Sequence, residues 1–124
     1  SSLAHDSHNL LLIGRDIVSM VSAARTVHEL GGGVAVTDGD DVLATLSLPL
    51  FGLLSDRPVL EVARGLERIE DAMRRLGVTH QRPFLTLSIM ALSVSPYYKF
   101  TDKGIVDTER RTLIAPWEAV VGDD

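Results

Sequence analysis

The spacing of apolar residues changes along the chain, and each change predicts a different element. Residues 10–13 are four consecutive apolar side chains followed by Gly14, which is typical of a short strand buried on both faces. Apolar residues then recur every three or four positions from 17 to 30, which predicts an amphipathic helix. Asp16 is placed to cap the start of this helix, and Gly31 to end it.

A hairpin and a second helix are predicted next. Residues 34–36 and 42–48 are rich in apolar positions and flank an Asp-Gly turn, which favours a β-hairpin. Residues 58–76 carry apolar side chains at helical spacing, with Pro58 in the first turn and Gly77 at the end. Gly65, inside this helix, indicates close packing against a neighbour, because glycine weakens a helix by about 1 kcal/mol relative to alanine.

The last third of the chain gives a less definite prediction of secondary structure. Residues 84–94 form the longest apolar stretch, and their alternation favours a strand, with a helix as the alternative. Short closing strands are expected at 105–106 and 113–114, after an aromatic-rich loop. The predicted order is therefore β-α-β-β-α-β in a single domain of residues 1–124. This order indicates the α+β class (a two-layer α/β arrangement), with a mixed or largely antiparallel sheet and two helices on one face.

Composition narrows the class of function. The chain has no cysteine, which excludes disulfides, thiolate metal sites and thiol nucleophiles. Its net charge is −5, with basic and acidic residues interleaved, so we expect no binding to nucleic acid or to an anionic membrane. No apolar run approaches the roughly 20 residues that cross a bilayer, and no secretory signal is visible. These features predict a cytoplasmic protein whose partners are small molecules or other proteins.

The polar segment from His5 to Asn9 carries the candidate chemistry. His5 and His8 are three residues apart, but two histidines need a third ligand, and Asp6 is too close in sequence to complete a tetrahedral site. One interpretation is a polar cap over a small-molecule pocket, in which Asn9 offers both a donor and an acceptor. The other is turn chemistry at the entrance to a strand, which explains Asp6, Ser7 and Asn9 but does not require histidines.

Other polar motifs have structural explanations. The glycine run at 31–33 precedes a strand rather than a helix, which is the wrong order for a phosphate-binding loop. Ser88, Ser93 and Ser95 lack a nucleophile motif and an evident base. His28 and His80 are expected at the surface.

Five motifs, taken in order, resemble the C-terminal domain of bacterial adenine deaminase. They are the polar segment 4–9, the glycine run 31–33 before an apolar strand, and the segments 48–56, 83–88 and 101–104. Each motif alone is weak, but their order and spacing match over nearly the whole chain.

The resemblance implies part of a metal-dependent amidohydrolase that converts adenine and water into hypoxanthine and ammonia. In that family the metal ligands and acid–base residues lie in a preceding (β/α)₈ barrel, which needs roughly 200 residues or more by itself. It therefore implies no catalytic residue, metal ligand or cofactor in residues 1–124, and an isolated chain without activity. A divalent metal (manganese, iron or zinc) is implied in the barrel. For His5, Asp6, His8 and Asn9 it implies a role as substrate-binding or lid residues.

The expected partners follow from the same resemblance. They are adenine or a related purine and the amidohydrolase barrel domain of the same enzyme, with a homo-oligomer left open. The rival hypothesis is a stand-alone purine-binding or subunit-interaction module without catalysis. An independent enzyme with His5 or His8 as general base would need a second catalytic group, and none is identifiable in the sequence.

Overall fold

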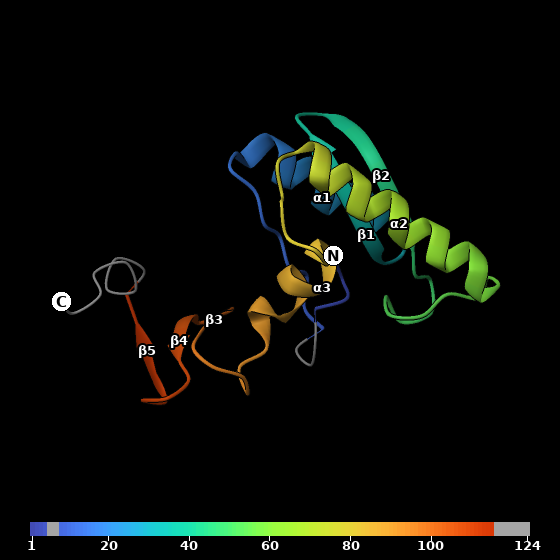
Figure 1. Ribbon diagram of the computed structural model, residues 1–124. Coiled ribbons are helices and arrows are strands. Elements are labelled where there is room, and N and C mark those ends of the chain that lie inside the picture. The colour runs from blue at the N-terminus through green and yellow to red at the C-terminus, as the bar shows by residue number, and fades with distance from the viewer. Residues whose placement is uncertain (5–7, 116–124) are drawn as a thin grey trace.

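The computed structural model describes residues 1–4 and 8–115, and Figure 1 shows the arrangement of their elements. In chain order these are α1 (Ile17–Glu29), β1 (Gly33–Asp38), β2 (Asp41–Ser47), α2 (Val59–Arg75), α3 (Pro83–Ser88), the 3-10 helix η1 (Ile89–Ala91), β3 (Tyr98–Thr101), β4 (Gly104–Asp107) and β5 (Thr112–Ile114). Two antiparallel sheets form, β1-β2 and β3-β4-β5. The α+β class is confirmed. No helix in the described part of the chain is long and apolar enough to cross a membrane.

The predicted ends of the first two helices are confirmed. The Asp16 side chain accepts a hydrogen bond from the Ser19 N–H, at 2.8 Å, and so caps the start of α1. Gly31, at φ +71°, and Gly77, at φ +92°, follow α1 and α2 in the left-handed conformation that ends many helices.

The β1–β2 hairpin lies between α1 and α2, as Figure 1 shows. Val36 of β1 packs with Ala72 of α2. The next side chain, Thr37, points to the opposite face, where its Oγ1 donates to the Ser19 carbonyl of α1, at 2.8 Å. The two helices therefore cover opposite faces, which differs from the expected arrangement on one face. The physical reason is that β1 is apolar and buried on both faces.

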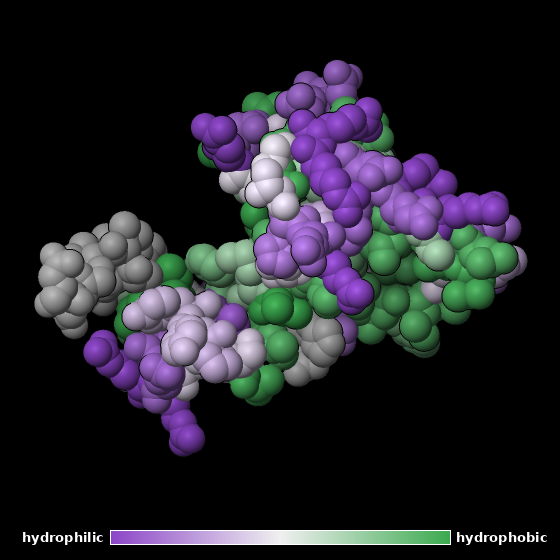
Figure 2. All heavy atoms as spheres, in the orientation of Figure 1, coloured by the Kyte–Doolittle hydropathy of each residue, from purple (hydrophilic) through white to green (hydrophobic). Residues whose placement is uncertain are grey.

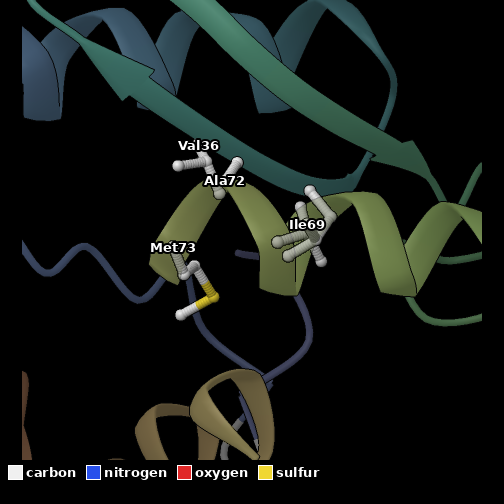
Figure 3. Close-up of a cluster of buried hydrophobic side chains, with 5 residues drawn as sticks. Val36, Ile69, Ala72 and Met73 are labelled. Atoms are coloured by element: carbon white, nitrogen blue, oxygen red, sulfur yellow. The ribbon is translucent and has the colours of Figure 1, made fainter. Parts of the chain in front are cut away.

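The main core lies between β1 and α2. Figure 3 shows Val36 and Ala72 side by side at this interface, and Val34, Ile69 and Met73 belong to the same buried cluster. Ile69 and Ala72 are fully buried.

Gly65 lets α2 lie directly on β2. A Cβ at this position would come within 2.7 Å of the Leu46 Cδ1 atom, so the Leu46 side chain would have to move to admit any larger residue. The prediction of close packing at Gly65 is thus confirmed. On the exposed side of α2, Arg74 forms an ion pair with Glu70, at 3.1 Å, and a second with Asp71, at 2.9 Å.

Residues 10–13 do not form the predicted strand. Leu10 and Ile13 are 51% and 50% exposed, and among the described residues the only backbone partner of this segment is Ser1, which pairs with Leu11. A strand forms when neighbouring strands satisfy its N–H and C=O groups, and within the described residues this segment has no such neighbour beyond Ser1.

Residues 83–91 adopt the helical alternative rather than the strand. Pro83 begins α3 and is fully buried. The Thr86 and Ser88 side chains, whose spacing had favoured a strand, donate to carbonyls one turn back, those of Arg82 at 2.9 Å and Leu85 at 2.8 Å. The alternation of apolar and hydroxyl residues therefore did not indicate a strand, because the hydroxyls form hydrogen bonds within the helix.

The C-terminal sheet projects from the layered part of the molecule (Figure 1). Its strands β4 and β5 confirm the two closing strands, while β3 lies in the segment predicted as an aromatic-rich loop. The Thr101 Oγ1 donates to the Gly104 carbonyl, at 2.8 Å, and closes the turn between β3 and β4. This sheet packs against η1 through β3, and is thus joined to the layered part through a short element.

Candidate functional site

The residues just before the polar segment lie near the start of β1, where Ser2 contacts Gly33. His5 and Asp6 lie outside the described residues, whereas His8 and Asn9 are described and exposed. The His8 backbone adopts φ +46°, and its N–H donates to the Ala4 carbonyl, at 2.7 Å. Ala4 is fully buried. The chain therefore leaves the protein interior at Ala4 and presents His8 and Asn9 to solvent.

Ser2 connects the start of this segment to two distant loops. Its N–H donates to the Gly33 carbonyl, at 2.9 Å, and its Oγ accepts from the Gly33 N–H, at 2.8 Å. The same hydroxyl donates to the Gly52 carbonyl, at 2.6 Å. One side chain, two residues before the polar segment, thus joins two of the five motifs: the glycine run and the loop after β2.

The glycine run allows the backbone of two loops to touch. A Cβ on Gly32, which has φ +120°, would lie 2.4 Å from the Gly52 Cα atom. A Cβ on Gly33, at φ +140°, would collide with the Leu46 carbonyl. Glycine is required at both positions for close approach of main chains, not for phosphate binding.

The loop between β2 and α2 presents an apolar patch beside this junction. Phe51 is 92% exposed and has φ +58°, and Leu50 and Leu54 bridge the base of its turn. Figure 2 shows apolar surface over this loop and over the start of α2. We call the exposed side chains Phe51, Leu54, Val59 and Leu60 the loop–helix patch. An apolar surface that is held on an ordered turn is typical of a contact site for another protein surface.

A groove of about 450 Å³ runs along the open edge of β1. Residues 11–16 form the opposite wall, α1 lines one side, and the end of α2 together with α3 lines the other. Most lining side chains are apolar, and polar groups gather at one end, around Arg15, Asp16 and Ser19. The groove adjoins the polar segment through Ser1, which lines its other end.

Two ionisable groups beside the groove have shifted pKa values. Burial lowers the pKa of the Ser1 α-amino group from 8.0 to about 6, and this nitrogen donates to the Leu11 carbonyl, at 2.9 Å. The backbone N–H of Ser19, followed by its hydroxyl, lowers the pKa of Asp16. Both shifts follow from local packing and helix capping, and neither creates an acid–base pair.

The described residues do not fit a divalent metal. Within residues 1–4 and 8–115, no three histidine, aspartate or glutamate side chains come together. His28 and His80 are exposed, as expected, and His80 Nδ1 lies 2.9 Å from the Thr86 Oγ1 in a local contact. No hydrolytic step is therefore assigned to a metal on this part of the chain.

The remaining motifs have structural roles, and one contributing residue was missed. Residues 83–88 form α3, and residues 101–104 contain the turn between β3 and β4. Ser2 had no predicted role, because its hydrogen bonds join residues 31 and 50 positions away. No local pattern in the sequence marks such a contact.

Comparisons with known proteins agree on one family. The sequence profile of the adenine deaminase C-terminal domain matches residues 1–112. An adenine deaminase of Oleidesulfovibrio alaskensis is 42% identical over 118 residues, which are 95% of this chain and 21% of that protein. Adenine deaminases of Cereibacter sphaeroides and Moorella thermoacetica are 46% and 48% identical over 114 and 109 residues, covering 92% and 87% of this chain and 20% and 18% of those proteins.

The chain thus spans about a fifth of the length of these curated relatives. The match covers the Ser2 junction, both glycine-dependent loops and the described sheets up to β5. This chain belongs to the adenine deaminase C-terminal domain family.

Proposed function

We propose that this chain forms the C-terminal domain of an adenine deaminase, which converts adenine and water into hypoxanthine and ammonia. The observation that carries this proposal is the identity of 42–48% to proteins named adenine deaminase, over most of this chain. In the proposal, a separate amidohydrolase barrel supplies the acid–base groups and a divalent metal (manganese, iron or zinc).

The polar segment is proposed to contact the purine or to close over it. Neutral imidazole and amide groups each offer a donor and an acceptor, which suits the edge of a purine ring. His8 and Asn9 are exposed, and Ala4, just before the segment, is buried. His5 and Asp6 are included in the proposal from the sequence. An anchored loop with exposed polar side chains can order groups around a ligand at a small entropic cost.

The loop–helix patch is proposed to dock on the barrel domain. Four-fifths of the length of the curated relatives lies outside this match, so a large partner surface is present in those proteins. The hydrogen bond from Ser2 to Gly52 ties the loop that carries the patch to the residues just before the polar segment, which supports this proposal. Docking through Phe51 would therefore bring the polar segment to the barrel with a defined orientation.

The role of the polar segment can be tested in the full-length enzyme that contains this domain. We expect His8→Ala and Asn9→Ala to lower kcat/KM for adenine by about 10- to 100-fold, because each removes a contact to substrate. His28→Ala is the matched control, since His28 is exposed on α1 and has no proposed contact with substrate. Unchanged kcat/KM in both variants would exclude this role, provided that circular dichroism shows intact folding.

The isolated chain separates this proposal from its alternative. A domain that only completes a barrel site should release no heat when titrated with adenine. A stand-alone purine-binding module should bind adenine with a measurable heat and a negative heat-capacity change. Saturable binding of adenine by the 124-residue chain would therefore favour the alternative.

A further inference from the structure

The groove beside β1 begins where two residues already act as a short strand. Ser1 and Leu11 exchange two backbone hydrogen bonds, both of 2.9 Å, which is the pattern of an antiparallel pair. The Ser2 N–H points to the other side and donates to the Gly33 carbonyl of β1, at 2.9 Å. Ser1 and Ser2 thus lie between β1 and residues 11–13. At this end of the groove they supply hydrogen-bond partners to the backbone groups of both walls.

Beyond Ser1, the backbone groups of both walls lack partners. Because N–H and C=O groups alternate in direction along a strand, those of Ala35 point to the same edge as those of Gly33, away from β2. Among the described residues, no hydrogen bond reaches this edge of Ala35 or the backbone of Ile13. Two rows of unpaired groups therefore face each other across the groove.

Both faces of the groove are apolar. Met20 and Ala23 of α1 line one face, and Met73, Phe84 and Leu87 from α2 and α3 line the other. A slot with unpaired backbone on both edges and helices on both faces has the chemistry of a missing central strand. A small apolar ligand would leave the backbone groups of Ala35 and Ile13 unsatisfied, at an energetic penalty.

We propose that this slot holds an extended segment of the longer polypeptide, the residues that lead directly into Ser1, as a strand antiparallel to both walls. The pairs already formed fix the register. Since Ser2 faces Gly33, the first residue before Ser1 lies opposite Ala35; since Ser1 faces Leu11, the second lies opposite Ile13. The inference rests on the proposed function only in taking the chain as part of a longer protein.

The occupant is favoured by its connection to Ser1. Ser1 lies at the end of the slot, and its nitrogen already donates to the Leu11 carbonyl as a peptide N–H would. A covalently joined segment has a high effective concentration and avoids the entropy loss of binding a separate peptide. About four residues, at 3.4 Å each, would extend from Ala35 to Asp38.

Filling the slot would change the sheet and the polar segment together. Residues 10–13 would become a strand parallel to β1, joined to it through α1, which is the connection that parallel neighbours require. The added strand would run into Ser1, and residues 10–13 follow Asn9, so paired strands would lie on either side of the candidate residues His5 to Asn9. The added strand therefore fixes both ends of the loop that carries the candidate substrate contacts.

The test compares N-terminal extensions of the 124-residue chain. One extension is Val-Ala-Val-Ala, whose side chains suit two apolar faces. Its matched control is Val-Ala-Val-Pro, because proline removes the N–H that would meet the Ala35 carbonyl. A Gly-Ser-Gly-Ser extension controls for conversion of the buried Ser1 amine into an amide. Amide hydrogen exchange, resolved by NMR, is measured for Ala35 and Ile13.

We expect the first extension to slow exchange of both amides by about tenfold or more, with much smaller effects from the two controls. Equal exchange in all three forms would overturn the proposal. Protection of Ala35 that rises with protein concentration in the unextended chain, and is unchanged by extension, would assign the slot to a second copy and also overturn it. Because the readout does not involve deamination, it is independent of the test of the proposed function.

Discussion

The β1–β2 hairpin and the β3–β4–β5 sheet are both antiparallel, yet the rest of the chain supports them very differently. The hairpin lies between α1 and α2, and β1 is buried on both faces (Figure 1). The second sheet has strands of three or four residues and packs against the short element η1. The hairpin, covered by a helix on each face, is therefore the better supported of the two sheets. The Ser2 junction and the polar segment are attached to the hairpin.

The largest expected effect comes from removing buried apolar volume at the hairpin. Ile69→Ala should lower the free energy of unfolding by about 2–5 kcal/mol, because Ile69 is fully buried against β1. Leu113→Ala in β5 should lower it by under about 1 kcal/mol, because Leu113 is 57% exposed. Urea unfolding followed by circular dichroism measures both. Equal losses would mean that the second sheet contributes as much as the first.

A smaller effect is expected from glycines in the two regions. Gly32→Ala should destabilise the protein by about 2–4 kcal/mol, because the added Cβ meets the Gly52 backbone at a positive φ. Gly104 also has a positive φ, but a Cβ added there would have its nearest neighbour 3.9 Å away. Gly104→Ala should therefore lower the free energy of unfolding by only about 1–2 kcal/mol. Thermal and urea unfolding of the two variants give the difference. A larger loss at Gly104 would contradict the close contact of the two loops.

The smallest effect is a pH dependence confined to the layered region. Burial lowers the pKa of the Ser1 amine to about 6, so between pH 6 and 8 the unfolded chain binds more protons than the folded one. Stability should therefore rise with pH across this window, by about 1–2 kcal/mol, and fall as pH drops toward 6.

NMR can locate this titration, and acetylation can remove it. The amide resonance of Leu11 should titrate with a midpoint near the amine's pKa of about 6, whereas that of Ile105 in β4 should not follow it. Acetylation of the Ser1 nitrogen should abolish the amine's contribution. If the pH dependence is identical after acetylation, it does not arise from the Ser1 amine.

Local signals predicted the elements that depend on local chemistry. Asp16 capping, the Asp-Gly turn and the glycines after the helices all act within a few residues, and the structure confirms α1, the β1–β2 hairpin and α2. The apolar segments 10–13 and 84–94 were mispredicted as strands, because apolar content shows only that a segment tends to be buried. Which backbone partners it finds depends on distant residues.

The candidate site was likewise predicted from the sequence only in part. The sequence singled out His8 and Asn9 and related five motifs to one family, and His5 and Asp6 were predicted with them but lie outside the described residues. It gave no sign that Ser2 joins Gly33 to Gly52, or that Phe51 stands exposed beside that junction. Such contacts need a three-dimensional arrangement of loops that are far apart along the chain.

By itself, then, the sequence determined the capped helices, the hairpin, the family and the polar segment, since residue type and short spacing are sufficient for each. Only the tertiary structure decided that α1 and α2 cover opposite faces, that the glycines serve main-chain contact, and that a slot remains open beside β1. The reason is physical: hydrogen bonds and packing between distant segments depend on which surfaces meet, and no local pattern records that choice.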